Sequence, residues 1–329
     1  MLLEHLAYAG EPRIAVHQTS AGKGSAYLVT EPNNWGRFGP DDQRGTLNLL
    51  TPAVVLDALR SAVTGEVLSL AMPIRGATSS PAPGTVPHLP GRPLPQHFMS
   101  VDGGDYAAGA RPIGAGLRVA DDALIVTHHG TTTHMDALCH MWSGDELYNG
   151  HPAARVRSYG ATRCGIEHVG GVVSRGVLYD VPRRLGLGHL PADYRVPAAL
   201  LEEIAVPRPG DVAVIRTGWP LVWERSREEY WSGQPGLSAE AGRWLAAHDV
   251  AAVAADNAAI GGLDAHGLAA EPIEDDLHLL LLHRHGVHLI ELLWLEELAA
   301  AGRAEFVFVA APLRVEGGTG SPLTPLAIL

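Results

Sequence analysis

Apolar residues recur along the chain in short runs rich in Val, Ile and Leu, a pattern typical of β-strands. These runs lie at residues 66–74, 123–129, 171–181, 211–218, 250–256, 287–293 and 305–315. Helical patterns lie between them: Thr51 and Pro52 form an N-cap and first helical position, and further helices are expected over 238–248, 274–285 and 294–303. The alternation predicts an α/β fold with a mixed sheet.

The stretch from Gly76 to Gln96 is rich in Pro, Gly and Ser and has no periodicity, so we expect a long surface loop there. The sequence contains no internal repeat and no low-complexity tract. We therefore expect one domain over residues 1–329 with long loops. Residues 1–65 are expected to form an N-terminal segment that packs on this domain or on a neighbouring subunit.

Composition is that of a globular protein, with 46% hydrophobic and 18% charged residues. The net charge of −12 would repel the phosphate backbone, so we expect no nucleic-acid partner. Two cysteines without a C-x-x-C neighbour form no disulfide scaffold. The N-terminus has no signal-peptide pattern, and no run approaches the ~18 apolar residues of a membrane span. We expect a protein of the cytoplasm with no membrane association.

Seventeen histidines are present, and four of them share one window with an aspartate, HHGTTTHMDALCH. In an extended segment His134 and Asp136 point to the same side, because side chains alternate along a strand. Imidazole and carboxylate together suit Zn²⁺ or Mn²⁺. A bare H-x-D-x-x-x-H pattern also arises by chance, in which case these histidines are ordinary surface or core residues.

A second cluster in the C-terminal third favours the metal site. His278 lies on the helix expected over 274–285, and Glu291 lies in the apolar run VHLIELL. A buried carboxylate is costly unless it is paired, hydrogen-bonded or bound to a metal. We favour a ligand role for Glu291 over a structural salt bridge.

The sequence resembles the cyclase family that includes bacterial kynurenine formamidase and isatin hydrolase. The family motif H-x-G-T-H-x-D-x-x-x-H is matched without gaps from His134 to His140, but its first histidine falls on Gly130. Either His129 or His128 replaces that histidine through an insertion, or the ligand is missing. The resemblance extends over nearly the whole chain, through the segments NNWGRFGPDDQRGTLN, MWSGDELYNG, VAVIRTGW, AADNAAI and PLRVEGGTGSPLTPLAIL.

This resemblance implies a swivelling β/β/α-type domain, a homodimer or homotetramer, and a site for one or two divalent ions, with Zn²⁺ expected first and Mn²⁺ as the alternative. By the same resemblance, Asp136 is a ligand that could bridge two ions, and His140 is the catalytic acid/base. An imidazole titrates near ~6.5, which suits general acid–base catalysis. A third metal ligand is the alternative role for His140. The remaining ligands implied are His129, His134, His278 and Glu291.

Together these features predict a metal-dependent hydrolase that cleaves an amide, lactam or lactone bond of a small cyclic or aromatic substrate by metal-activated water. A polyketide-type cyclase that uses the same metal is one alternative. A binding protein without catalysis is another, because the first half of the motif is irregular and related folds host different functions. The sequence lacks the G-x-S-x-G, Walker-type, H-E-x-x-H and dinucleotide-binding motifs, which disfavours the enzyme classes that depend on them.

Three further residues are weaker candidates for substrate binding. Trp35 and Phe38 could supply an aromatic wall, or else pack the N-terminal segment onto the domain or a neighbouring subunit. Asp256 follows an expected strand and could contact substrate or orient a ligand histidine. Alternatively, it caps a turn, the more common role of an Asp-Asn pair before a loop.

Overall fold

The computed structural model describes residues 32–75 and 86–329. Residues 32–329 group into one compact unit. Residues 1–31 of the expected N-terminal segment (1–65) lie outside the described part of the chain, and so do residues 76–85 of the expected loop. Within that part, no helix is long and apolar enough to cross a membrane.

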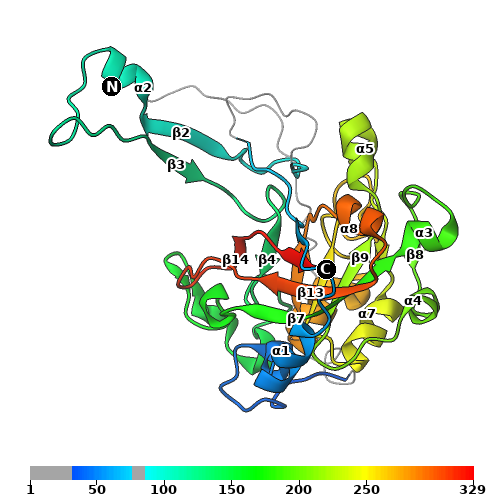
Figure 1. The fold of residues 1–329 in the computed structure, drawn as a ribbon. Coiled ribbons are helices and arrows are strands. Elements are labelled where there is room, and N and C mark those ends of the chain that lie inside the picture. The colour runs from blue at the N-terminus through cyan, green and yellow to red at the C-terminus, as the bar shows by residue number, and fades with distance from the viewer. Residues whose placement is uncertain (1–31, 76–85) are drawn as a thin grey trace, which may run out of the picture. The chain divides into compact units, whose positions relative to one another are not determined.

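A nine-stranded mixed sheet forms the framework, in the order β1-β15-β13-β7-β9-β11-β12-β4-β14 (Figure 1). Its strands β7, β9, β11 and β12 are parallel, whereas the flanking strands pair antiparallel. Strands β9 and β11 are buried along their whole length, as expected of parallel strands covered on both faces. Their bounds are β1 (Val67–Ser69), β4 (His134–Asp136), β7 (Val172–Asp180), β9 (Val212–Arg216), β11 (Ala252–Ala255), β12 (His288–Glu291), β13 (Glu305–Ala310), β14 (Gly320–Pro322) and β15 (Leu326–Ile328).

The helices expected after Thr51 and over 238–248 are present, the one expected over 294–303 is shorter, and short helices occur that the sequence pattern did not indicate. Thr51 caps α1 (Pro52–Leu59) by accepting from the Val54 amide, and Ser238 caps α7 (Ala239–Ala247) in the same way. Helix α1 packs on β7 and β13, and α7 packs on α4 (Ala198–Ile204). The other α-helices are α2 (Gly103–Ala107), α3 (Val181–Leu185), α5 (Pro220–Arg225), α6 (Arg227–Tyr230) and α8 (Glu296–Ala301).

The helix expected over 274–285 differs from the prediction. Its first turn is a separate 3-10 element, η5 (Ile273–Asp275), and the helix proper is η6 (His278–His285), which has π-helical hydrogen bonding. Gly286 ends it in a left-handed conformation at φ 65°, as expected of a C-terminal glycine. Single π-helical turns are frequent at functional sites, and this one begins at a candidate ligand, His278.

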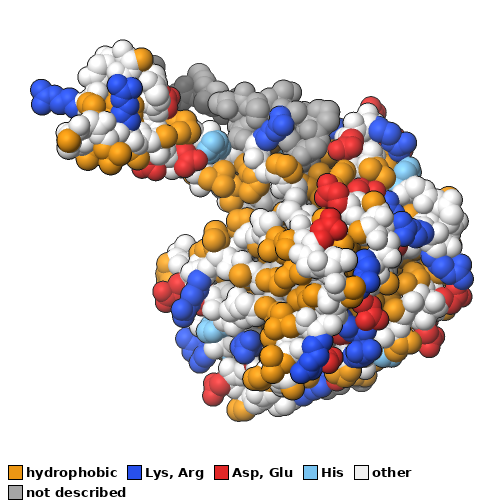
Figure 2. All heavy atoms as spheres, viewed as in Figure 1, with side chains coloured by type: hydrophobic (Ala, Val, Ile, Leu, Met, Phe, Trp, Pro, Cys, Tyr) orange, Lys and Arg blue, Asp and Glu red, His pale blue; other side chains and the backbone are white. Residues whose placement is uncertain are grey.

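The run expected as a strand over 123–129 also differs, because it ends early and lies outside the main sheet. Its strand, β3 (Asp121–Ile125), pairs with β2 (Gln96–Val101) to form a two-stranded ribbon. The large apolar residues Phe98, Met99, Leu124 and Ile125 are exposed on this ribbon, where Figure 2 shows hydrophobic side chains at the surface. The chain after Ile125 is irregular, and it carries the HHGTTT segment into the next strand of the sheet, β4.

Short elements complete the chain. They are η1 (Gly45–Leu49), η2 (Tyr148–Gly150), η3 (Ala153–Arg155) and η4 (Ile166–His168), with the short strand pairs β5 (Val156–Arg157) with β6 (Gly160–Ala161) and β8 (Arg195–Val196) with β10 (Gly236–Leu237).

Candidate metal site

The register of three neighbouring strands brings carboxylates and histidines together. In the ladder between β12 and β4, Glu291 lies directly opposite His134. On the other side of β4, Gly320 of β14 lies opposite Asp136. His134 and Asp136 are two residues apart on an extended strand, as predicted, so they face the same side. All three charged or ionisable side chains are almost fully buried.

His134 is oriented by the backbone of the turn that precedes it. Its Nδ1 lies 2.8 Å from the Thr132 carbonyl oxygen, so Nδ1 carries the proton that it donates. The lone pair of Nε2 is therefore free. Nε2 faces Asp136 Oδ1 at 3.4 Å and Glu291 Oε2 at 3.5 Å, which is the orientation expected of a ligand histidine.

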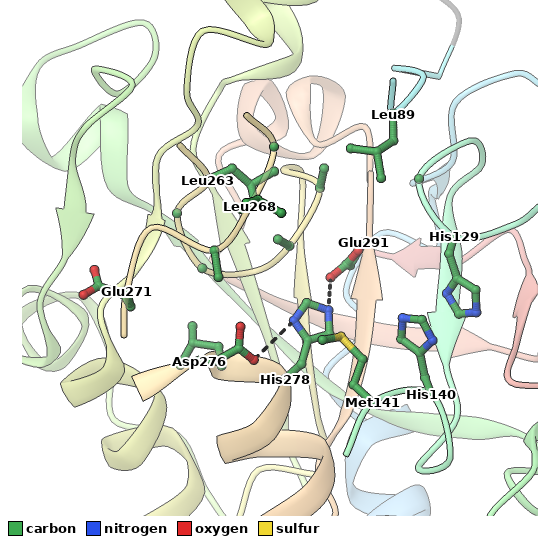
Figure 3. Close-up of a pocket in the computed structure, with 18 of the residues that line it drawn as sticks. Leu89, His129, His140, Met141, Leu263, Leu268, Glu271, Asp276, His278 and Glu291 are labelled. Atoms are coloured by element: carbon green, nitrogen blue, oxygen red, sulfur yellow. Dashed lines mark ion pairs between the residues drawn. The ribbon is translucent and has the colours of Figure 1, made fainter. Parts of the chain in front are cut away.

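His278 approaches the same carboxylates from the first residue of η6 (Figure 3). Its Nε2 lies 3.2 Å from Glu291 Oε1 and 3.7 Å from Asp136 Oδ2, and its Nδ1 lies 3.9 Å from Asp276 Oδ1. Burial opposes a charge on His278, but the hydrogen bond and charge of Glu291, with the charges of Asp136 and Asp276, raise its pKa to about 9. The carboxylates thus create a strong preference for positive charge at this point.

His129 joins the site despite the irregular motif. Its Nδ1 lies 2.9 Å from Asp136 Oδ1, whereas the Nε2 of His128 is buried without a hydrogen-bond partner. The turn absorbs the extra residue through Gly130, which adopts φ 73°. The hydroxyls of Thr131 and Thr132 close it by donating to carbonyls four residues earlier. This geometry fits an insertion before His134 rather than a missing residue.

His140 lies beside His129, with the two rings stacked at 3.7 Å between centroids and 5° between planes (Figure 3). Burial lowers the pKa of His140 to about 3, against the opposing charge of Asp136. The imidazole of the metal-free protein is therefore neutral at pH 7. Its position within reach of Asp136 and His278 is compatible with both roles considered for it, ligand and proton carrier.

The donor set fits a divalent cation. Two groups of donor atoms lie close enough to hold one, His129 with His134 and Asp136, and Asp136 with His140 and His278. Asp136 belongs to both groups. Its Oδ2 is buried without a hydrogen-bond partner, which is costly unless a cation satisfies it, while the Oε1 of Glu291 contacts His278 Nε2 at 3.2 Å. Burial and the repelling charge of Asp136 raise the pKa of Glu291.

The site opens into a cavity of about 380 Å³, a size suited to a small molecule. Apolar side chains form much of its wall: Leu89, Met141, Leu263, Leu268 and Leu277 (Figure 3). Arg92 is the one arginine among the described residues that line it, and no described carboxylate pairs with its guanidinium.

The loop that carries Leu89 and Arg92 is fastened to the His129 turn. The Leu89 amide donates to the Gly130 carbonyl at 2.8 Å, and the Arg92 amide donates to Leu89 at 3.2 Å. A Cβ on Gly130 would lie only 2.7 Å from Leu89 Cβ, so glycine is required for this contact. The wall of the cavity at Leu89 is therefore attached directly to the turn that carries His129.

The three candidate substrate-binding residues lie outside this cavity. Trp35 donates from Nε1 to the His283 carbonyl at 2.8 Å and so packs the N-terminal segment onto η6, while Phe38 lies under the Arg37 guanidinium. The carboxylate of Asp256 is fully buried and accepts from Thr217 and Gly218, which fits the turn-capping alternative.

Sequence reasoning missed several residues of the site. Leu89 and Arg92 fall in a stretch without periodicity, and Asp276 is one of several acidic residues before η6. None of the three was therefore marked by the sequence as a site residue. Thr319, whose hydroxyl contacts His129, is part of the C-terminal GGTGSP segment that the family resemblance includes. Its glycines were the available signal that a backbone approaches something closely there.

Comparisons with known proteins agree with this geometry. Residues 68–261 match the model of a family described as "Putative cyclase". A solved structure described as a novel cyclase is 38% identical, with 91% of this chain and 100% of that chain covered at a TM-score of 0.81. No curated protein matches the chain.

More distant solved structures share the fold. Isatin hydrolase A from Labrenzia aggregata is 19% identical, with 83% of this chain and 98% of that chain covered at a TM-score of 0.56. Isatin hydrolase A from Ralstonia solanacearum is 20% identical, with 84% and 96% covered and a TM-score of 0.56. These likenesses confirm the expected mixed α/β fold.

Proposed function

Because the chain belongs to this cyclase family, we propose that it is a metal-dependent hydrolase that opens an amide, lactam or lactone bond of a small cyclic or aromatic substrate. The observation that carries the proposal is the buried carboxylate pair of Asp136 and Glu291, with Asp136 Oδ2 left without a hydrogen-bond partner, surrounded by histidines at the end of an apolar cavity. Two fold relatives are named isatin hydrolases, and isatin is a cyclic amide on an aromatic ring.

The residues that would hold the cation are His129, His134, Asp136, His278 and Glu291, in one or two positions that share Asp136. Zn²⁺ suits this mixture of imidazole and carboxylate, with Mn²⁺ as the alternative. When bound, the ion supplies a Lewis acid that polarises a carbonyl and makes water acidic enough to attack at neutral pH.

The chain's own side chains supply the rest of the chemistry. His140 borders the cavity beside the ligand cluster, and its neutral imidazole accepts a proton from water and returns it to the leaving nitrogen or oxygen. Leu89, Leu263 and Leu277 exclude bulk water and favour an apolar ring. The cleaved bond is the carbonyl–heteroatom bond; water contributes hydroxide to carbon and a proton to the heteroatom.

The placement of His129 bears on the alternative of a binding protein without catalysis. That alternative rested on the loss of the first motif histidine, but the structure brings His129 to Asp136. Cyclisation remains a second candidate, because the 38% identical structure is described as a cyclase. The same site would then polarise a carbonyl for intramolecular attack.

Product mass separates the two reactions. Metal-loaded protein is incubated with isatin, an aryl formamide and simple lactones, and the masses of the products are measured by mass spectrometry. Hydrolysis adds one water to the substrate, and the activity is lost in His134→Ala but not in His97→Ala, an exposed histidine paired with Asp122. A protein that binds no divalent metal, or a His134→Ala variant with full activity, would refute the hydrolase.

A further inference from the structure

The His129 ring is held between two polar groups. Its Nδ1 faces Asp136 Oδ1 at 2.9 Å, and its Nε2 faces the hydroxyl of Thr319 at 3.1 Å. The two contacts come from opposite ends of the imidazole, so together they fix both the direction and the tilt of the ring. Thr319 lies immediately before β14, in the C-terminal segment.

Thr319 has little freedom to move away from His129. Its carbonyl accepts from the Ala137 amide at 2.9 Å, and the next residue, Gly320, pairs with Asp136 in the sheet. A Cβ on Gly320 would lie 2.7 Å from His129 Cε1, so the backbone itself closes one side of the ring. The strand that carries Asp136 therefore also positions the segment that carries the hydroxyl.

A hydroxyl is suited to this position because it both donates and accepts. With the proton on Nδ1, Nδ1–H donates to Asp136 and the Thr319 hydroxyl donates to the Nε2 lone pair. If Nδ1 were to ligate a cation it would have to offer its lone pair; the proton would then reside on Nε2, and the hydroxyl would accept from it. The hydroxyl therefore gives Nε2 a hydrogen-bond partner in both tautomers.

We propose that Thr319 is a positioning residue that lets His129 change tautomer when a divalent ion binds and thereby sets the affinity of the site. The inference rests on the metal site of the proposed function and adds to it a residue outside the ligand set. Partners that orient ligand histidines typically change metal affinity about 10- to 100-fold when removed.

The experiment compares Thr319→Val, which keeps the shape and removes the hydroxyl, with Thr319→Ser, which keeps the hydroxyl. Thr324→Val is the matched control, because Thr324 lies in the same segment, is exposed and lines a different surface. Zn²⁺ affinity is measured by calorimetry against a competing chelator. The tautomer of His129 is followed by ¹⁵N NMR of the imidazole nitrogens before and after Zn²⁺ is added.

We expect Thr319→Val to weaken Zn²⁺ binding about 10- to 100-fold, with Thr319→Ser within about threefold of wild type and Thr324→Val unchanged. In wild-type protein the His129 proton moves from Nδ1 to Nε2 on Zn²⁺ binding. If Thr319→Val does not fold, Thr319→Ala replaces it, and the same weakening of Zn²⁺ binding relative to Thr319→Ser is expected.

Two results would overturn it. Wild-type affinity in Thr319→Val, or a His129 proton that does not move, refutes the role of Thr319 while the metal site stands. A wild-type protein that takes up no Zn²⁺ or Mn²⁺ refutes the proposed function together with this inference.

Discussion

Replacing Glu291 with glutamine tests the metal site most directly, because it keeps the side-chain volume and removes one charge. The carboxylate is buried and lies between two histidine nitrogens, 3.5 Å from His134 Nε2 and 3.2 Å from His278 Nε2. A carboxylate oxygen that ligates a divalent ion lies about 2 Å from it, where the Coulomb attraction is roughly 16 kcal/mol at an effective dielectric constant of about 20. Desolvation offsets most of this attraction, and a net loss of about 2 kcal/mol is a ~30-fold change in affinity.

Thermal unfolding converts that change into a measurable shift. With Zn²⁺ at about 100 times the wild-type Kd, binding stabilises the wild-type fold by ~2.7 kcal/mol, which raises Tm by about 4 °C in a chain of this size. A ~30-fold weaker variant gains only ~0.9 kcal/mol, or under about 2 °C.

The control is Glu297→Gln, an exposed glutamate without an ion pair among the described residues. This variant should keep the full shift. A Glu291→Gln variant that is stabilised by Zn²⁺ as much as wild type would show that Glu291 is not a ligand.

Three further predictions follow from single side chains. His140→Ala should bind Zn²⁺ normally and lose about 10²- to 10⁴-fold in kcat, and loss of metal instead would make His140 a ligand. Burial raises the pKa of Asp256 to about 6 from 3.8, despite its hydrogen bonds, so the folded protein holds a proton that the unfolded chain releases. This carboxyl should therefore lower the unfolding free energy by ~3 kcal/mol as pH rises from 3.8 to 6, a dependence that urea denaturation should find absent in Asp256→Asn. Arg92 lines the cavity, and its guanidinium should attract a carboxylate on the substrate. Arg92→Gln should therefore raise KM about fivefold for N-formylanthranilate, which carries a carboxylate, and not for formanilide, which lacks one. Arg303→Gln should change neither KM.

The sequence pattern predicted the elements that depend on local rules. Thr51 and Ser238 occupy N-cap positions because a hydroxyl satisfies an exposed amide, and Gly286 ends η6 because it tolerates positive φ. The parallel strands were visible as apolar runs because both of their faces are buried.

Elements that depend on distant partners were not predictable in this way. Strands β14 and β15 lie in a stretch with Pro322 and Pro325, where the pattern is broken, and pairing with β4 and β13 makes them strands. The strand β2 begins at the last residue of the expected loop and was not predicted, because its run QHFMSV has no alternation of buried and exposed positions. Tertiary context overrides local propensity in both places.

The candidate ligands were predictable where spacing encodes geometry and not where it does not. His134 and Asp136 share a face by strand parity alone, and Glu291 was conspicuous as an acid in an apolar run. The choice between His128 and His129 could not follow from spacing, since it depends on how the turn at Gly130 packs against Leu89. The role of Trp35 could not follow from the sequence, because an aromatic residue beside a glycine fits a pocket wall and a packing contact equally well.

The position of His129 shows how an irregular motif can still bring a histidine to Asp136. The ligand position of His134 is set by the β4 ladder with β12 and β14, which tolerates no slip because one residue would turn Asp136 away from the site. His129 precedes the strand, so its approach is set by side-chain contacts instead, with Asp136 on one nitrogen and Thr319 on the other. An extra residue in the turn would leave those two contacts in place, so His129 is positioned by its partners rather than by its spacing from His134.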